Sequence, residues 1–168
     1  MQMILTLDNQ TLFPEPITIK LWPDLAPIAI HRLREVVAMN KFDGIRMERL
    51  EPGFVIQPLF FDGKDPEVDV MVEPEFMTNP RNHALSFKRG TVAMAGDADH
   101  ASGCQFFISL SDTERLNGNF TVIGEVVDGF TSVDALDQTE VTACLDEASG
   151  FTYHCPKDDV IIRSVRIE

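Results

Sequence analysis

Short runs of hydrophobic residues, separated by Gly, Pro, Asn and Asp, recur along the chain and are typical of strands. In Gly44–Leu50, for example, apolar and polar residues alternate as they do on the two faces of a strand. Eight such runs, short enough to close a barrel, predict a mainly β fold built on a closed eight-stranded barrel. The expected strands are Met3–Leu7, Ile17–Leu21, Gly44–Leu50, Phe54–Ile56, Thr91–Ala95, Phe106–Leu110, Thr121–Val127 and Val160–Ile167.

Two segments follow helical spacing instead. The first begins at Pro27, a residue favoured in the first turn of a helix, and ends near Asn40. Its apolar positions are Ile30, Leu33, Val36 and Val37. A second, shorter helix should begin after Thr131 or Ser132, either of which can cap it. Its buried positions are Val133 and Leu136. We expect the two helices to cover the two ends of the barrel.

Two further segments are less regular. Residues 62–75 contain six acids and one base, Lys64, with valines alternating between them. We interpret this stretch as a solvated edge strand or loop, because its acids lack the spacing of an EF-hand calcium loop. The acids are Asp62, Asp65, Glu67, Asp69, Glu73 and Glu75. Residues 137–156 show no clear pattern and are expected to form a long surface excursion.

The length of 168 residues suits one domain with a single core, so we expect one domain over residues 1–168. Hydrophobic residues make up 44% and charged residues 24%, which excludes a disordered or fibrous chain. Acidic residues outnumber basic ones by 27 to 14, and no basic run could follow a phosphate backbone. Nucleic acid is therefore not an expected partner.

The three cysteines, Cys104, Cys144 and Cys155, are too few and too scattered for a disulfide framework, which favours a reducing compartment. The first ten residues carry neither a basic leader nor an apolar stretch of signal length. No uncharged apolar run reaches the roughly 18 residues of a membrane span. We expect a cytoplasmic protein with no membrane partner.

Arg49 shares one face of its strand with Ile45 and Met47. Either its stem packs while its head reaches water, or its guanidinium is fixed beside an apolar pocket. Gln105 and Phe107 likewise share a strand face that mixes polar and aromatic groups. Such a face suits the wall of a binding groove, although a half-buried solvent face has the same pattern.

Other chemistry is poorly supported. The four histidines, at positions 31, 83, 100 and 154, are isolated from one another and have no metal-ligand spacing, so no metal is expected. The chain has no nucleophile elbow, phosphate-binding loop or dinucleotide fingerprint. Cys104 is interpreted as a small buried residue rather than a nucleophile.

Several stretches form a recognisable series. Phe-Asp-Gly at 42–44 continues to Arg-Leu-Glu-Pro-Gly-Phe-Val-Ile-Gln at 49–57, and Arg-Gly-Thr-Val-Ala-Met-Ala at 89–95 leads to Gly-Cys-Gln-Phe-Phe-Ile at 103–108. Leu-Asn-Gly at 116–118 and Val-Ile-Gly-Glu-Val-Val-Asp-Gly at 122–129 follow. In this order and spacing, the chain resembles the cyclophilins, a family of peptidyl-prolyl cis-trans isomerases, as a divergent, bacterial-like member.

The resemblance implies an antiparallel eight-stranded barrel capped by two helices. Arg49 stands where the family has its catalytic arginine, and Gln57 where a glutamine orients that side chain. The resemblance also implies no cofactor and a monomer that acts on proline-containing peptides or unfolded proteins. The implied substrate-binding residues are Phe54, Val55, Ala95, Gly96, Gln105, Phe107, Arg115, Leu116 and Phe120.

Some positions depart from the family. Phe120 replaces a common histidine, Arg115 a frequent tryptophan and Gly96 a usual asparagine. Pro58-Leu59 replaces a Gly-Gly pair, and the acidic stretch replaces a glycine-rich loop. These changes alter the rim of the implied pocket more than its centre.

Rotation about an Xaa-Pro bond faces a barrier of about 20 kcal/mol, because the nitrogen lone pair is delocalised into the carbonyl. A guanidinium that hydrogen-bonds the nitrogen of the twisted amide would favour the transition state, and Arg49 is the candidate donor. Two other hypotheses stay open: a proline-peptide binding module with little or no isomerase activity, and a scaffold without a working groove.

Overall fold

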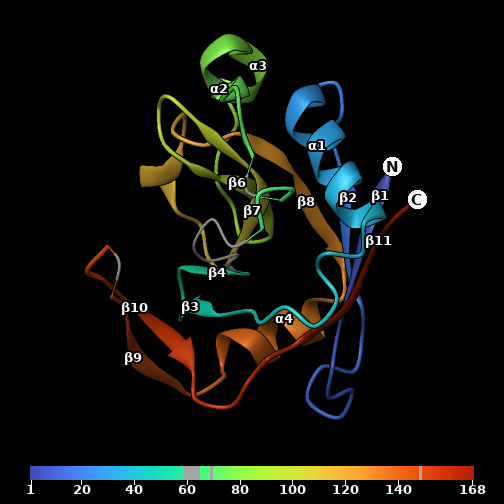
Figure 1. Cartoon of the computed structure of the whole chain (residues 1–168), viewed down its shortest axis with the longest axis vertical. Coiled ribbons are helices and arrows are strands. Elements are labelled where there is room, and N and C mark those ends of the chain that lie inside the picture. Colours follow the sequence, from blue (N-terminus) through green and yellow to red (C-terminus); the bar gives the residue numbers. More distant parts are fainter. Residues whose placement is uncertain (59–64, 69, 148) are drawn as a thin grey trace.

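Alternating hydrophobic residues bury one face of β1 (Gln2–Leu7), where Met3, Leu5 and Leu7 point into the core. The fold built on this strand is a computed structural model, which describes residues 1–58, 65–68, 70–147 and 149–168. Figure 1 shows a curled sheet with helices at its edges and the two chain ends side by side.

The described residues form a nine-stranded antiparallel sheet in the order β11-β1-β2-β8-β6-β7-β4-β3, with β5 paired to β7. Besides β1, its strands are β2 (Ile17–Leu21), β3 (Arg49–Glu51), β4 (Val55–Gln57), β5 (Met71–Val72), β6 (Thr91–Gly96), β7 (Ala101–Ser109), β8 (Val122–Asp128) and β11 (Ile162–Ile167). The mainly β prediction is confirmed, and β5 is a short strand within residues 62–75, the stretch interpreted from the sequence as a solvated edge strand or loop.

The predicted closed barrel is not confirmed. β3 and β11 stand at the two ends of the strand order, and no ladder between described residues joins them. The expected strand at Gly44–Leu50 is reduced to Arg49–Glu51, because the residues before it make only isolated contacts with the β11 side. These contacts include a single bridge between Arg46 and Ile161 and the 2.8 Å bond from the Gly44 N–H to the Ile162 oxygen. The sheet is therefore curled and open.

The two predicted helices are present at slightly different bounds. α1 (Pro27–Ala38) begins at the expected proline and ends before Asn40, and α4 (Phe130–Asp137) begins earlier than expected, after Gly129 in the left-handed conformation. α1 lies against β7 and β11, and α4 lies against β2 and β3. Figure 1 shows them at opposite ends of the curled sheet. Three short helices complete the fold: α2 (Glu75–Thr78), α3 (Pro80–His83) and the 3-10 turn η1 (Glu114–Leu116).

The surface excursion expected at 137–156 contains a hairpin of β9 (Val141–Asp146) and β10 (Phe151–Pro156), which forms a separate two-stranded sheet. A disulfide joins Cys144 to Cys155 across it, with a Cα–Cα distance of 6.0 Å. The expectation that the cysteines form no disulfide is therefore wrong for this pair. The register places Cys144 opposite Tyr153, so the disulfide to Cys155 runs diagonally across the hairpin. Cys104 is buried, as predicted.

Apolar side chains gather on both faces of β7. Phe106 and Ile108 belong to the main core inside the curl, which also contains the buried faces of α1 and α4. Phe107 belongs to a smaller second cluster on the other face. The remaining buried members of this second cluster are Val55, Phe87, Ala93, Leu116 and Val122. β7 thus separates the core from the floor of the candidate site.

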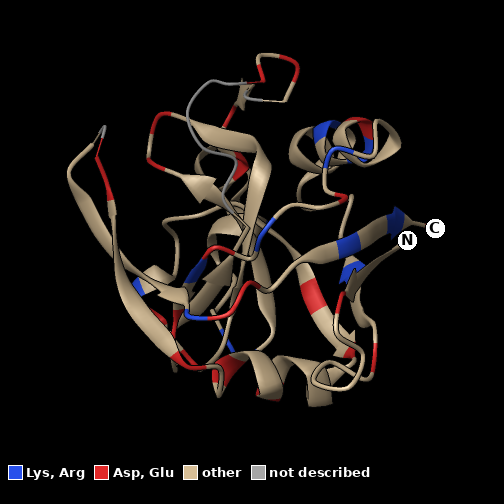
Figure 2. Ribbon diagram, turned by 60° about the horizontal axis from the view of Figure 1, so that its bottom comes forward, with Lys and Arg blue, Asp and Glu red and all other residues tan. Residues whose placement is uncertain are grey.

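Acidic residues are spread over loops and strand ends around the molecule, with basic residues between them (Figure 2). Among the described residues, none of the helices has the length and apolar character needed to cross a membrane.

Candidate active site

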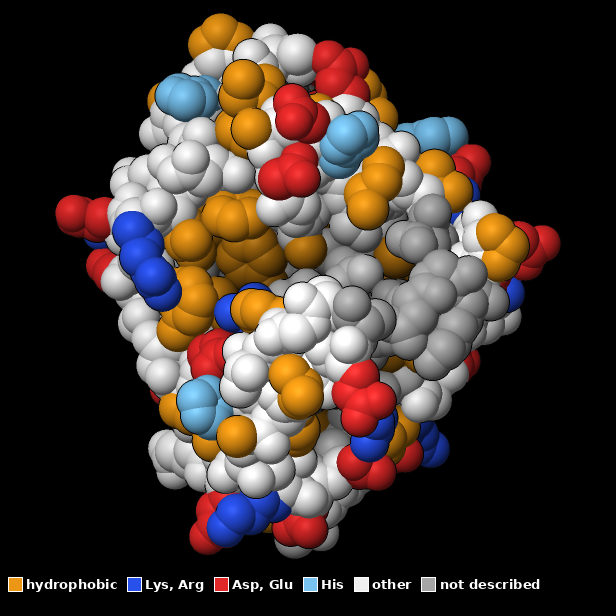
Figure 3. Space-filling view, turned by 60° about the vertical axis from the view of Figure 1, so that its left-hand side comes forward, with side chains coloured by type: hydrophobic (Ala, Val, Ile, Leu, Met, Phe, Trp, Pro, Cys, Tyr) orange, Lys and Arg blue, Asp and Glu red, His pale blue; other side chains and the backbone are white. Residues whose placement is uncertain are grey.

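A hollow of about 280 Å³ opens over the second cluster. Figure 3 shows hydrophobic side chains lining a hollow on this face, with a basic side chain at its edge. Nine of the eleven residues predicted for the site line it: Arg49, Phe54, Val55, Gln57, Ala95, Gly96, Phe107, Leu116 and Phe120. The other two, Gln105 and Arg115, contact lining residues. β3 pairs with β4, its neighbour in the sequence, and the pairing of β4 with β7 brings both next to a segment that lies far along the chain.

A cluster of three aromatic rings supports the apolar part of the hollow, and two of them line it. The rings of Phe107 and Phe120 meet edge to face at 5.3 Å between centroids, a favourable arrangement for aromatic pairs. Phe87, which sequence reasoning missed, stacks on Phe107 at 6.0 Å and meets Phe120 edge-on at 6.4 Å. Because Phe87 is fully buried, it holds the two lining rings from below.

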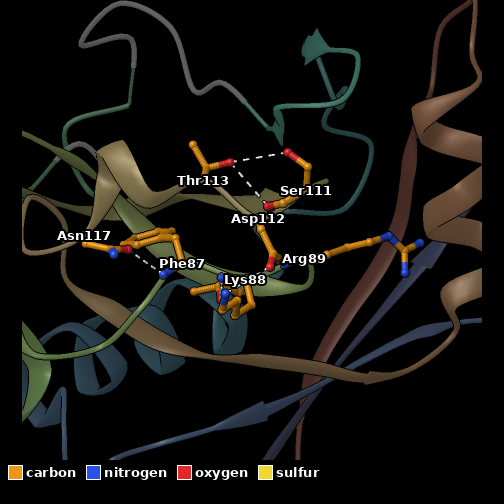
Figure 4. Close-up of polar contacts among 8 residues, drawn as sticks. Phe87, Lys88, Arg89, Ser111, Asp112, Thr113 and Asn117 are labelled. Atoms are coloured by element: carbon orange, nitrogen blue, oxygen red, sulfur yellow. Dashed lines mark hydrogen bonds and ion pairs between the residues drawn. The ribbon is translucent and has the colours of Figure 1, made fainter.

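A polar frame fixes Phe87 in place (Figure 4). Its backbone N–H donates to Oδ1 of Asn117 at 2.7 Å, and its carbonyl accepts from the Thr113 N–H at 3.0 Å. Nearby, Asp112 accepts from the Arg89 N–H and from Nζ of Lys88, both at 3.0 Å. These bonds, from the Arg89 backbone first and the Lys88 side chain second, lower the pKa of Asp112 below its ordinary value.

The charged side chain of the hollow is Arg49, which is half-buried on β3. Register places it directly opposite Gln57 on β4, and its Nη1 donates to Oε1 of Gln57 at 3.4 Å. Gln57 is buried and donates in turn from Nε2 to Oε1 of Gln105 at 3.4 Å. A chain of three side chains thus leads from β7 to the guanidinium.

Sequence reasoning missed two other neighbours of this guanidinium. Nε of Arg49 donates to Oε1 of Glu51 at 3.4 Å, and the guanidinium carbon lies 5.3 Å from the ring centroid of Phe151. Glu51 lies two residues along the same strand, so the period of two could have identified it. Phe151 lies on the β9–β10 hairpin, for which the sequence showed no signal.

Of the departures from the family pattern at positions 96, 115 and 120, the first two lie at the rim, and Phe120 is one of the aromatic walls of the hollow. The exposed Arg115 lies over the ring of Phe54 with its guanidinium carbon 4.2 Å from the centroid, a cation–π contact. At Gly96, φ is +148°, and an added Cβ would collide with the His100 carbonyl oxygen. The local backbone therefore requires glycine at position 96 and excludes a side chain there.

The described part of the acidic segment is not uniformly solvated. Asp65 and Glu67 pair with Lys41 at 2.7 and 3.3 Å, and Glu75 is buried. The prediction of a solvated edge strand or loop is wrong for Glu75, because its buried carboxylate accepts hydrogen bonds from the first turn of α1. Three charged residues of this segment, Asp62, Lys64 and Asp69, lie outside the described residues, as does Leu59. Within the described ranges, the His, Cys, Asp and Glu side chains form no group that could hold a metal ion.

Comparison with known proteins places these features in context. The family model described as cyclophilin type peptidyl-prolyl cis-trans isomerase/CLD matches residues 4–167. Peptidyl-prolyl cis-trans isomerase B of Escherichia coli is 31% identical over 160 residues, which cover 90% of this chain and 93% of that protein. A probable peptidyl-prolyl cis-trans isomerase of Brucella suis is 31% identical over 134 residues, 71% of this chain and 65% of the Brucella protein. The match therefore spans slightly less than two thirds of the Brucella relative.

Solved structures agree on the fold. A cyclophilin type peptidyl-prolyl cis-trans isomerase of Cryptosporidium parvum, crystallised in the presence of the dipeptide Ala-Pro, superposes with a TM-score of 0.77. The two are 21% identical, and the superposition covers 100% of this chain and 99% of the other.

Proposed function

The chain belongs to the family of cyclophilin-type peptidyl-prolyl cis-trans isomerases, and we propose that it catalyses cis-trans isomerisation of Xaa-Pro bonds in peptides or unfolded proteins. The hollow over Phe107, Leu116 and Phe120 has apolar walls suited to a proline ring. The Ala-Pro dipeptide used with the Cryptosporidium structure supports a proline-containing substrate for this chain as well.

Arg49 is the proposed catalytic residue. Its guanidinium lies at the edge of the apolar hollow and donates to Gln57, so its orientation is set before substrate arrives. When the amide twists, its nitrogen becomes pyramidal and accepts a hydrogen bond, and a donor at that place stabilises the transition state more than either planar isomer. Arginine stays protonated across the physiological pH range, so the step needs no proton transfer and no cofactor.

The observation that carries the proposal is this position of Arg49, half-buried and directly beside a hollow with aromatic walls. We expect Arg49→Ala to lower the catalysed exchange rate by about 10²- to 10³-fold, the usual effect of removing one preorganised donor. Exchange spectroscopy by NMR on an Xaa-Pro peptide measures this rate directly. The matched control is Arg163→Ala, since Arg163 is exposed on β11 and does not line the hollow.

A second candidate function is a proline-peptide binding module with little isomerase activity. It is favoured by the ion pair between Arg49 and Glu51, because the carboxylate offsets part of the charge that the mechanism needs. Peptide titration followed by chemical shifts separates the two candidates. Binding without faster exchange would support the binding module, and unchanged exchange in Arg49→Ala would contradict the proposed mechanism.

A further inference from the structure

The β9–β10 hairpin lies outside the main sheet and packs against β3, the strand that carries Arg49 (Figure 1). A two-stranded hairpin is only marginally stable alone in water, so its contacts determine where it lies. The buried Tyr153 donates to Oε1 of Glu48 at 3.1 Å, and burial followed by that carboxylate raises the pKa of Tyr153 to about 12. The Cys144–Cys155 disulfide links the two strands of the hairpin to each other, and the bond from Tyr153 to Glu48 anchors the hairpin beside the candidate active site.

Phe151, at the start of β10, contacts the proposed catalytic group directly. Its ring centroid lies 5.3 Å from the guanidinium carbon of Arg49, within the range of cation–π attraction. The ring also stacks on Tyr153 at 5.8 Å with an interplanar angle of 16°, so the buried tyrosine supports it from behind. Phe151 therefore limits how far the guanidinium can move away from the hollow.

His154 acts on the same guanidinium through Glu51. Nδ1 of His154 lies 2.7 Å from Oε2 of Glu51, and its backbone N–H donates to Oε1 at 3.2 Å. Burial alone would raise the pKa of Glu51, but the bonds from the His154 ring and backbone and the charge of Arg49 lower it below its ordinary value. The carboxylate is thus held ionised, with Oε1 shared between Arg49 and the His154 backbone and Oε2 occupied by the ring.

We infer that Phe151 and His154 are positioning residues that hold Arg49 for isomerisation, Phe151 by direct contact and His154 through Glu51. With Oε2 occupied by His154, Glu51 offers Arg49 only one oxygen, and Nη1 of the guanidinium stays on Gln57. Without the ring, both oxygens of Glu51 become available for a bidentate pair, the geometry that guanidinium and carboxylate prefer. That pair would draw the donor away from the hollow. The inference rests on the proposed function.

The test compares His154→Ala, His154→Asn and Phe151→Leu, with Thr152→Ala as an exposed control in the same strand. Asn can place an amide N–H where Nδ1 of the imidazole stands, so it should restore the bond to Glu51. We expect His154→Ala and Phe151→Leu to lower kcat for an Xaa-Pro peptide by about 3- to 10-fold, the range of one lost hydrogen bond or cation–π contact, with KM unchanged. His154→Asn should recover most of kcat, and Thr152→Ala should match the parent chain.

A second readout follows Arg49 itself. The Nε–H of Arg49 donates to Glu51, so its NMR cross-peak should shift or broaden in His154→Ala and return in His154→Asn. Normal kcat and an unchanged Arg49 signal in folded His154→Ala and Phe151→Leu would overturn the inference. So would a loss of kcat that His154→Asn does not recover while the Arg49 signal stays constant. If the parent chain shows no isomerase activity, the proposed function fails, and the Arg49 signal alone then decides whether the hairpin positions the guanidinium.

Discussion

Helix α1 begins without a capping side chain of its own, and a buried carboxylate from another helix takes that role. The residue before Pro27 is Ala26, which cannot accept a hydrogen bond through its side chain. Instead, the two carboxylate oxygens of Glu75 accept from the N–H groups of Ile28 and Ala29, both at 2.9 Å. Because these are the amides that an N-cap residue normally satisfies, Glu75 stands in for the missing cap. The perturbations of choice are Glu75→Ala and Glu75→Gln.

The expected loss of stability can be worked from the two bonds. Ala29 is buried, so its N–H loses its partner without access to water, which costs about 1 to 3 kcal/mol. Ile28 is 42% exposed, and water can replace part of its bond. With a cap contribution of about 1 kcal/mol, we expect Glu75→Ala to lower the free energy of unfolding by about 2 to 4 kcal/mol. Glu75→Gln keeps one acceptor oxygen and should lose less.

The pH dependence of this effect has a definite sign. Burial raises the pKa of Glu75 above its ordinary value of 4.5, and the bonds from Ala29 and Ile28 only partly oppose the shift. The folded state therefore binds the proton more tightly than the unfolded state. The stabilisation that comes from proton binding to Glu75 is fully present below pH 4.5, the ordinary pKa of the group, and is lost as the pH rises through the raised pKa. Glutamine does not titrate and cannot show this change.

Urea unfolding followed by the fluorescence of Trp22, the single tryptophan, measures the difference between parent and Glu75→Gln from about pH 4 to pH 8. We expect the parent's advantage to be largest at the acidic end and to shrink as the pH rises. Glu125→Gln removes the same charge from an exposed residue of β8 and controls for net charge, whereas Glu73 itself helps to raise the pKa of Glu75. An advantage that instead grows with pH would refute the reasoning, because the helix amides would then outweigh burial.

Three further outcomes follow from the structure. Asn82 is buried and hydrogen-bonds both the N–H and the carbonyl of Val122. Asn82→Leu should therefore lower the free energy of unfolding in urea by about 2 to 4 kcal/mol, and a loss under about 1 kcal/mol would contradict this. Replacing Cys144 and Cys155 by serine removes a covalent link that closes a loop of 11 residues. The chain-entropy model values such a link at about 3 kcal/mol, so hydrogen exchange of the β10 amides should accelerate. Unchanged exchange would show that packing alone holds the hairpin. Arg115→Glu reverses the charge at the rim. At low salt, this variant should have a KM about 2- to 5-fold higher than the parent for peptides with an acid beside the proline. Equal KM values of the variant for acidic and basic peptides would argue against contact with Arg115.

Local patterns predicted the helices and strands whose buried residues recur at a fixed period along the chain. α1 was predicted because its buried residues recur at helical spacing after a proline that suits the first turn. β1 and β2 were predicted at nearly their observed bounds because their buried residues alternate. The motifs around Arg49 and Phe107 identified residues that the structure brings to one hollow.

Elements that depend on distant partners were not predictable in this way. β9 and β10 contain one buried residue between them, Tyr153, so no apolar alternation marks them. The hairpin is held by one disulfide between its strands and by contacts with β3. The role of Glu75 is hidden for the same reason, since a carboxylate among other acids predicts a solvated loop. Glu75 lies 46 residues from Ala29 in the sequence, and only the hydrogen bond between them in the folded chain shows that Glu75 caps a helix.

The direction of the Arg49 side chain could not be predicted from the alternation of its strand. Strand alternation states which face a side chain occupies, and this left two interpretations open, a snorkelling arginine and one fixed beside a pocket. The choice between them depends on the bond to Gln57, 8 residues away, and on Glu51, whose second oxygen is occupied by His154, 103 residues away. A period of two contains no information about the last of these contacts. We therefore expect the direction of the guanidinium to depend on the hairpin packed against β3 as well as on Gln57, and variants at His154 and Phe151 measure the contribution of the hairpin.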